Sequence, residues 1–296
     1  MKFDQKITPC IWFDNNASEA VKFYMNVFEN GKIITSLNNT EDSNASAPDS
    51  VLTIGFELEG FRFLALNGGA TFRPNPSISF FVNTTDKMHI KRMWDKLSKE
   101  GIVRMELDEY DYSPYYGWIE DKYGVSWQLM TVEKEPDQKI VPCLLFTEAV
   151  YGRAEEAANF YSSVFPDSSM GMVARYPAGS APDKEGAIMY ADLQLSGEKF
   201  VVMESGHEHR FQFNEGVSLM VNCETQDEID QYWNKLTEGG KEVQCGWLQD
   251  KFGVSWQIVP KNILRLIKPE NKEKSKRAMK AMMGMIKLNI KELEEA

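Results

Sequence analysis

The sequence predicts an α+β protein made of two tandem domains, followed by a helical tail. Three observations support this prediction. The chain has 296 residues, which is enough for two domains that each have a core. A stretch of twelve residues occurs twice, with nine positions identical. The order strand, helix and three strands also recurs, twice in each half, so each domain is expected to contain a pair of βαβββ modules.

The repeated stretch occupies residues 117–128 and 246–257. The first copy reads Gly-Trp-Ile-Glu-Asp-Lys-Tyr-Gly-Val-Ser-Trp-Gln, and the second has Leu, Gln and Phe at the three changed positions. An apolar run is followed by Asp-Lys-aromatic-Gly, in which the glycine can take the positive φ of a tight turn. A strand with alternating apolar and polar residues comes next. We therefore predict a β-hairpin at the end of each half.

Apolar periodicity gives the elements of the first half in order. Residues 7–13 form a strand, with Pro9 near its start, where a strand tolerates proline. Residues 17–28 form a helix, because Ala20, Phe23 and Val27 recur at helical spacing. Strands are expected at 32–37, 51–57, 61–66 and 78–82, a polar loop at 38–50 and a second helix at 85–100.

The second half repeats this order. Strands are expected at 140–146, 171–176, 187–195, 199–203 and 217–221, and helices at 154–165 and 226–238. Thr225 and Glu228 form the capping-box pattern at the start of the last of these helices. The first half has about ten additional residues, around 106–115, which are acidic and rich in tyrosine. We predict a surface loop there, with a lid over a cavity as the alternative.

The predicted domain boundaries are 1–132 and 138–260, and residues 261–296 form the tail. Met279, Met282, Met283 and Ile286 make an apolar stripe at helical spacing. Asn289, three residues before Glu292, predicts a capped final turn. The stripe is expected to pack on the body of the protein or on a partner chain, so self-association through the tail helices is one expectation.

Composition excludes several classes of partner. The net charge of −11 argues against nucleic acid and anionic membranes as partners. No apolar run approaches the roughly 20 residues of a membrane-spanning helix, and the first residues lack the apolar region of a signal peptide. The four cysteines do not have CxxC spacing and are expected to be reduced thiols. We therefore expect a cytoplasmic protein.

These features together resemble a known superfamily. The βαβββ modules, the Phe-Tyr pair of the first helix in each half and the Asp-x-x-Gly hairpin are similar to the vicinal oxygen chelate superfamily, which includes glyoxalase I and bleomycin-resistance proteins. The full repeated motif resembles its PhnB-like branch, often labelled 3-demethylubiquinone-9 3-methyltransferase. The resemblance covers residues 5–132 and 138–260. It implies two glyoxalase/bleomycin-resistance-like domains, each of which curls its sheet around a cleft.

The resemblance also indicates where a metal would bind. Metal enzymes of the superfamily take ligands from defined strand positions, and the residues at those positions here are apolar or neutral. The carboxylate of the final strand is replaced by Gln128 and Gln257. Apolar side chains do not coordinate metals, and a lone amide is a poor ligand. We therefore expect no metal, and we interpret the cluster His207-Glu208-His209 as part of a polar loop.

The positions of the glycines show whether the chain has the cofactor site that the methyltransferase label of the PhnB-like branch would require. Common S-adenosylmethionine enzymes have a glycine-rich turn between a strand and a helix. Here Gly68-Gly69 follows a predicted strand without opening a helix, and Gly239-Gly240 ends one. We therefore expect no such cofactor.

Strand alternation identifies candidate ligand-binding residues. If the final strands follow the superfamily, both repeated glutamines point into the clefts, and other residues share that face. The candidates are Phe13, Trp118, Ser126, Gln128, Phe146, Trp247, Ser255 and Gln257. An aromatic and apolar pocket with an amide and a hydroxyl suits a small amphipathic or aromatic molecule. The alternative for each residue is that it only fills the core.

Cys245 is the candidate catalytic residue. A nucleophilic thiolate needs a nearby base, such as His207 or His209, and the alternative is an inert buried thiol. Three functions stay open. We favour metal-independent binding of a small molecule; the others are an enzyme of the superfamily and an assembly protein whose clefts are filled.

Overall fold

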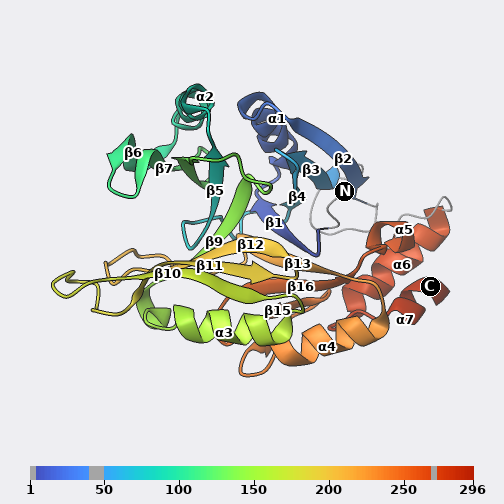
Figure 1. The fold of residues 1–296 in the computed structure, drawn as a ribbon. Helices are drawn as coiled ribbons and strands as arrows, with labels where there is room; N and C mark the ends of the chain where they lie inside the picture. Colours follow the sequence, from blue (N-terminus) through green and yellow to red (C-terminus); the bar gives the residue numbers. More distant parts are fainter. Residues whose placement is uncertain (1–4, 40–49, 268–271) are drawn as a thin grey trace.

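The computed structural model describes residues 5–39, 50–267 and 272–296. Most of the predicted polar loop, residues 40–49, lies outside this part. The described residues form two eight-stranded sheets with helices packed against them (Figure 1). The predicted α+β class and the repeated βαβββ modules are confirmed.

The first repeat, residues 1–132, contains two modules. Module 1 consists of β1 (Ile7–Phe13), α1 (Ala17–Val27), β2 (Gly31–Asn38), β3 (Val51–Leu58) and β4 (Phe61–Asn67). Module 2 consists of β5 (Ile78–Thr84), α2 (Lys87–Leu97), β6 (Ile102–Tyr110), β7 (Ser113–Glu120) and β8 (Ser126–Thr131).

The second repeat, residues 138–260, has the same order, and the tail follows it. Module 3 consists of β9 (Ile140–Phe146), the short 3-10 helix η1 (Glu148–Val150), α3 (Ala154–Val164), β10 (Ser169–Arg175), β11 (Ile188–Leu195) and β12 (Glu198–Glu204). Module 4 consists of β13 (Val217–Cys223), α4 (Gln226–Leu236), β14 (Lys241–Glu242), β15 (Trp247–Gln249) and β16 (Ser255–Pro260). The tail contains α5 (Ile263–Ile267), α6 (Lys272–Gly284) and α7 (Ile290–Glu295).

Each sheet takes one module from each repeat. Sheet A has the order β14-β15-β16-β13-β1-β4-β3-β2 and combines modules 4 and 1. Sheet B has the order β10-β11-β12-β9-β5-β8-β7-β6 and combines modules 3 and 2. The junctions are the antiparallel pairs β1–β13 and β5–β9. The expectation that each repeat curls its own sheet is therefore corrected, because the modules that share a sheet come from different repeats.

The two modules of one repeat instead pack together through the faces that their helices cover. In the first repeat the rings of Phe63, on β4, and Phe80, on β5, meet edge to face with centroids 5.1 Å apart. Trp127, on β8, lies against both rings and is fully buried. Figure 1 shows the first repeat, in blue to green, above the second. We call the sheet faces that α1–α4 leave uncovered the inner faces; they lie between the repeats.

A buried aspartate explains the repeated hairpin. Asp121 Oδ1 accepts hydrogen bonds from the backbone N–H groups of Tyr123 (2.8 Å) and Val125 (3.1 Å) and so closes the turn. Its Oδ2 accepts from the Tyr24 hydroxyl (2.8 Å) and from Trp127 Nε1 (2.9 Å). Asp250 makes the corresponding four bonds in the second repeat. The hairpin motif and the tyrosine of the Phe-Tyr helix thus belong to one network that joins two modules.

The additional residues 106–115 form the end of the β6–β7 hairpin, not the predicted loop. Tyr110 pairs with Ser113 across its turn. The rings of Tyr110, Tyr112 and Tyr116 pack on one another with centroids 5.3 to 5.6 Å apart. This ring packing gives the long hairpin apolar contacts that a solvated loop would lack.

The tail bridges the two edges of sheet A. Met279 of α6 packs with Leu37 on β2, at one edge. At the other edge, the backbone N–H groups of Cys245 and Gly246 donate to the carbonyls of Met285 (2.7 Å) and Ile286 (2.8 Å). The segment after α6 also contacts α4, because Gln226 Nε2 donates to the Leu288 carbonyl at 3.2 Å, and Figure 1 shows the tail helices beside this sheet.

The predicted caps of α4 and α7 are confirmed. Thr225 Oγ1 accepts from the backbone N–H of Glu228 (3.2 Å), and Asn289 Oδ1 accepts from that of Glu292 (3.1 Å). Of the helices in the described residues, none is long and apolar enough to cross a membrane.

Candidate functional site

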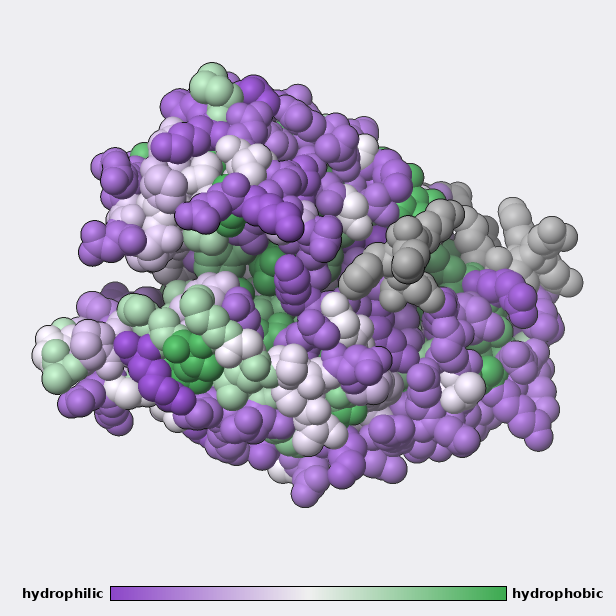
Figure 2. Space-filling view, in the orientation of Figure 1, coloured by the Kyte–Doolittle hydropathy of each residue, from purple (hydrophilic) through white to green (hydrophobic). Residues whose placement is uncertain are grey.

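The inner face of sheet B carries an apolar cluster that is separate from the main core. Phe81, Tyr116, Val141, Cys143 and Val201 are its buried members, and partly exposed side chains surround them. Figure 2 shows an opening between the two repeats on the side of β6 and β10, with apolar residues at its floor. An open apolar face of this kind is typical of a binding site.

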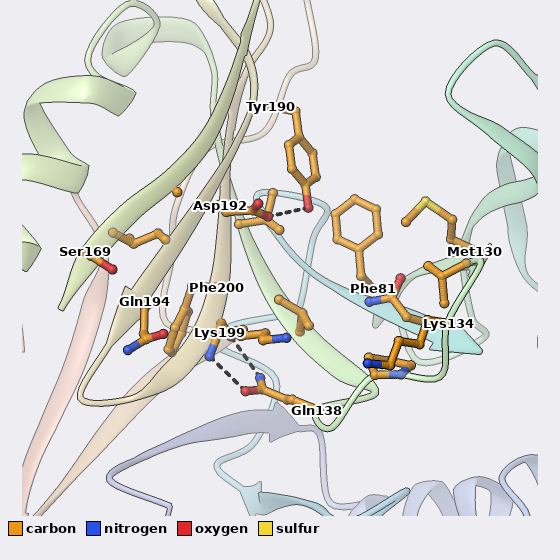
Figure 3. Close-up of a pocket in the computed structure, with 17 residues that line it drawn as sticks. Phe81, Met130, Lys134, Gln138, Ser169, Tyr190, Asp192, Gln194, Lys199 and Phe200 are labelled. Carbon is orange, nitrogen blue, oxygen red and sulfur yellow. Dashed lines mark hydrogen bonds between the residues drawn. The ribbon is translucent and has the colours of Figure 1, made fainter. Parts of the chain in front are cut away.

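A pocket of about 320 Å³ lies in this face. Its walls come from strands β5 and β8–β12 and from the segment that links the repeats, residues 132–138. The apolar lining includes Phe81, Met130, Val141 and Val201, and Tyr190 stands beside them on β11. Figure 3 shows the side chains of both repeats converging on the cavity.

Polar groups around the pocket come from the same strands and the linking segment. They are Asn83, Lys134, Gln138, Ser169, Asp192, Gln194 and Lys199. Asp192 Oδ1 accepts the Tyr190 hydroxyl at 2.9 Å. Asn83 Oδ1 is buried and has no hydrogen-bond partner within the described part of the chain. A ligand in the pocket would therefore meet an apolar floor and a polar rim.

The structure places three of the predicted residues beside this pocket, on the same face but outside its lining. Gln128 is only 2% exposed; its Nε2 donates to Ser79 Oγ (2.8 Å) and its Oε1 accepts from the Tyr116 hydroxyl (2.6 Å). Trp118 Nε1 donates to Ser126 Oγ at 2.7 Å. Because protein groups already bond both ends of the amide, Gln128 in this arrangement links three strands.

The corresponding residues of the second repeat lie on the inner face of sheet A. Gln257 Nε2 donates to Ser218 Oγ at 2.9 Å. The ring of Trp247 meets that of Trp12 edge to face, with centroids 6.0 Å apart. Ser255 Oγ is buried and has no partner among the described residues.

Phe13 and Phe146 do not point to the inner faces, so their predicted orientation is wrong. Phe13 packs against Tyr123 in the helix-covered core, and Phe146 packs there against Phe213. The first strand of each half is apolar on both sides, so its pattern does not reveal which face is which, and a shift of one residue exchanges the faces. Cys143 takes the inner position instead.

The buried thiols are poor nucleophiles. Burial raises the pKa of Cys10 to about 11 and that of Cys143 to about 12; hydrogen bonds with the neighbouring serine and glutamine lower the pKa but do not outweigh burial. Both thiols are therefore protonated near neutral pH, and a protonated thiol does not attack.

Cys245 is not paired with a histidine. Its Sγ lies 3.7 Å from the Met283 sulfur of the tail, and burial raises its pKa. His209 Nε2 bonds to Ser205 Oγ (2.7 Å), and His207 lies 3.6 Å from Asp183. The base that a catalytic Cys245 needs is thus engaged elsewhere. In the residues that the structure describes, no three His, Cys, Asp or Glu side chains gather closely enough to hold a metal ion.

Sequence reasoning missed the pocket residues of β10–β12 and the linking segment. Lys134 and Gln138 had no signal beyond linker composition, because their role depends on the pairing of modules from different repeats. Asp192 and Lys199 lie on strands in which apolar and polar residues alternate in the sequence. That alternation could have shown that these two polar side chains share the inner face.

Comparison with known proteins agrees with this architecture. Glyoxalase I from Zea mays is 13% identical and superposes with a TM-score of 0.54, over 86% of this chain and 94% of its own. A PhnB protein from Bacillus cereus is 32% identical over 43% of this chain and all of its own, with a TM-score of 0.41. The chain therefore has a glyoxalase-like fold.

The family follows from the sequence. The profile of the family described as 3-demethylubiquinone-9 3-methyltransferase matches residues 5–130 and 138–259, which is most of the chain and both repeats. The chain belongs to this family. No curated protein matches it in sequence.

Proposed function

We propose that the protein binds a small organic molecule, without a metal, in the pocket of sheet B. The observation that supports this most directly is the asymmetry of the two inner faces: that of sheet B is open and holds a cavity of about 320 Å³, whereas the tail bridges the edges of sheet A. Pockets for small molecules commonly start at about 300 Å³ and combine apolar walls with a few polar groups. A cytoplasmic location, expected from the free cysteines, belongs to the same proposal.

The residues support binding more than methyl transfer. Gly68-Gly69 lies between β4 and β5, and Gly239-Gly240 follows α4, so neither glycine pair opens a helix as a dinucleotide-type turn does. The inner cysteines are held as neutral thiols by burial. The family description alone would support a transfer reaction.

A thermal-shift screen of aromatic and amphipathic metabolites tests the proposal. Met130 is half-buried in the pocket lining, so Met130→Trp fills the cavity and should abolish the shift produced by any hit. Met220 is also half-buried, on the inner face of sheet A, which makes Met220→Trp the matched control. That control should leave the shift unchanged.

Two results would count against this site. A hit that survives Met130→Trp and is lost in Met220→Trp would place binding on sheet A. A screen in which no compound stabilises the intact protein would contradict small-molecule binding. The unfolding temperature of each variant without ligand shows whether the substitution itself disturbs the fold.

A further inference from the structure

Two lysines stand at the same end of the sheet B pocket. Lys134 belongs to the segment that links the repeats, and Lys199 lies at the start of β12. Gln138 fixes these two segments together, because its Nε2 donates to the Lys199 carbonyl (2.9 Å) and its Oε1 accepts from the Lys199 backbone N–H (2.8 Å). Figure 3 shows Lys134, Gln138 and Lys199 on one side of the cavity and Tyr190 on the other.

Neither ammonium group is neutralised by the protein within the described residues. The nearby Lys139 differs, since it pairs with Glu135 (2.7 Å) and approaches Glu59 (3.6 Å). No ion pair of this kind involves Lys134 or Lys199 in that part of the chain. Two uncompensated positive charges beside one pocket are notable in a protein whose net charge is −11.

The pocket contains one carboxylate, Asp192, and it already has a partner. Its Oδ1 accepts the hydroxyl hydrogen of Tyr190 at 2.9 Å. The lining residues therefore include two ammonium groups and one hydrogen-bonded carboxylate, which leaves a net positive charge. A pocket of this charge attracts an anionic group more than a cationic one.

The apolar floor lies next to the basic end. Phe81, Val141 and Val201 are each at least nine-tenths buried, and Met130 is half-buried beside them. A ligand with an apolar body would cover these side chains, and an anionic group at one end would reach the lysines.

We propose that this pocket selects small amphipathic carboxylates, with the carboxylate at Lys134 and Lys199 and the apolar body on the inner face of sheet B. This inference rests on the proposed function and adds the chemical class of the ligand. The two lysines determine preference between ligands of one shape that differ in charge, because an uncharged ligand gains nothing from them.

Three probes of one shape test the inference: naphthalene-2-carboxylate, naphthalene-2-carboxamide and 2-naphthylmethylamine. Dissociation constants are measured by isothermal titration calorimetry with the full chain. The carboxylate should bind roughly tenfold more tightly than the amide, because a partly exposed ion pair contributes up to a few-fold per lysine. The amine should bind most weakly. The advantage of the carboxylate should shrink as salt rises.

The variant Lys134→Gln/Lys199→Gln should remove the advantage of the carboxylate and leave the affinity for the amide unchanged. The matched control is Lys22→Gln/Lys235→Gln, which alters two exposed lysines on α1 and α4, the helices of the outer faces. This control changes the net charge of the protein equally and should preserve the preference. A loss of preference in the control would show a general charge effect and would overturn the inference.

Equal affinity for the carboxylate and the amide would overturn the anionic preference while the proposed function stands. Tighter binding of the amine would overturn it in favour of Asp192 as the recognising group. If none of the three probes binds, this inference fails, whereas the proposed function fails only if the metabolite screen also yields no stabilising compound. Preference that persists in the double lysine variant would show that other groups select the charge.

Discussion

Asp121 and Asp250 are the side chains on which the repeated motif depends. Each is nearly fully buried and accepts four hydrogen bonds, two from its own turn and two from aromatic side chains. Desolvation raises the pKa of Asp121 from 3.8 to about 6, and it raises that of Asp250 as well. The hydrogen bonds act in the opposite direction but do not outweigh burial.

This raised pKa gives a pH-dependent stability. Between 3.8 and about 6, the folded protein holds a proton on Asp121 that the unfolded chain has released. The contribution of Asp121 to the free energy of unfolding is therefore larger near pH 4 and falls as the pH rises through 6. Urea unfolding from pH 4 to 7 should show wild type losing stability relative to Asp121→Asn over this window.

The same variant should be less stable than wild type at every pH in that range. An asparagine that keeps its Oδ1 on the turn presents an amide NH₂ to Trp127 Nε1, which donates to Asp121 Oδ2 at 2.9 Å in wild type. A buried donor left without a partner costs about 1–3 kcal/mol. Asp95→Asn, at an exposed site on α2, is the control and should lack both effects. A wild-type profile parallel to that of Asp121→Asn would contradict the raised pKa.

At this scale, the sequence pattern predicts correctly which face of the last strand in each half the helices cover. It does not predict this for the first strand of each half. Val125, Trp127 and Leu129 are apolar residues that alternate with Ser126 and Gln128, so the pattern identifies the helix-covered side. In β9, seven buried residues in a row carry no such alternation, and Phe146 was therefore placed on the wrong face.

At the scale of elements, the tail is what makes the two halves of the molecule different. Its predicted apolar stripe is divided, because α6 ends at Gly284. Met279 is buried against Leu37, while Met283 and Ile286 remain 58% and 49% exposed. Self-association through this exposed part stays a prediction. The segment after α6 also pairs with the backbone of Cys245 and buries Leu288.

Removing residues 261–296 should therefore expose Cys245. The thiol loses its contact with the Met283 sulfur and the backbone bond to Met285, so its alkylation by iodoacetamide should accelerate by on the order of tenfold. Mass spectrometry of peptides identifies which cysteine reacts. Cys143 is buried on sheet B, away from the tail, and serves as the internal control.

Two outcomes would contradict this role of the tail. An unchanged rate at Cys245 would show that the tail does not protect it. Faster reaction at Cys143 as well would indicate general unfolding and not a local contact. Light scattering on the same two proteins tests self-association, because a dimer that becomes a monomer on truncation would assign the contact to the tail.

At the scale of the whole molecule, the sequence showed how many modules there are but not which of them share a sheet. All four modules have the same strand order, so pairing within a repeat and pairing between repeats bury similar faces. The choice depends on contacts such as Phe63 with Phe80, which tie the two modules of one repeat back to back. Such long-range contacts are not visible in local patterns, and the pocket between repeats was unpredictable for the same reason.

The shared sheets predict that the repeats hold together without a covalent link. A protease site placed at residues 133–137, most of which are exposed, allows the folded protein to be cut between repeats. The β1–β13 and β5–β9 pairs would remain, and separation would leave four strands with unpaired edges. The cut protein should therefore elute at the mass of the intact chain and separate only in denaturant. If the repeats came apart as folded monomers in buffer, the two junctions would contribute little to stability, and the pocket between them would need another source of rigidity.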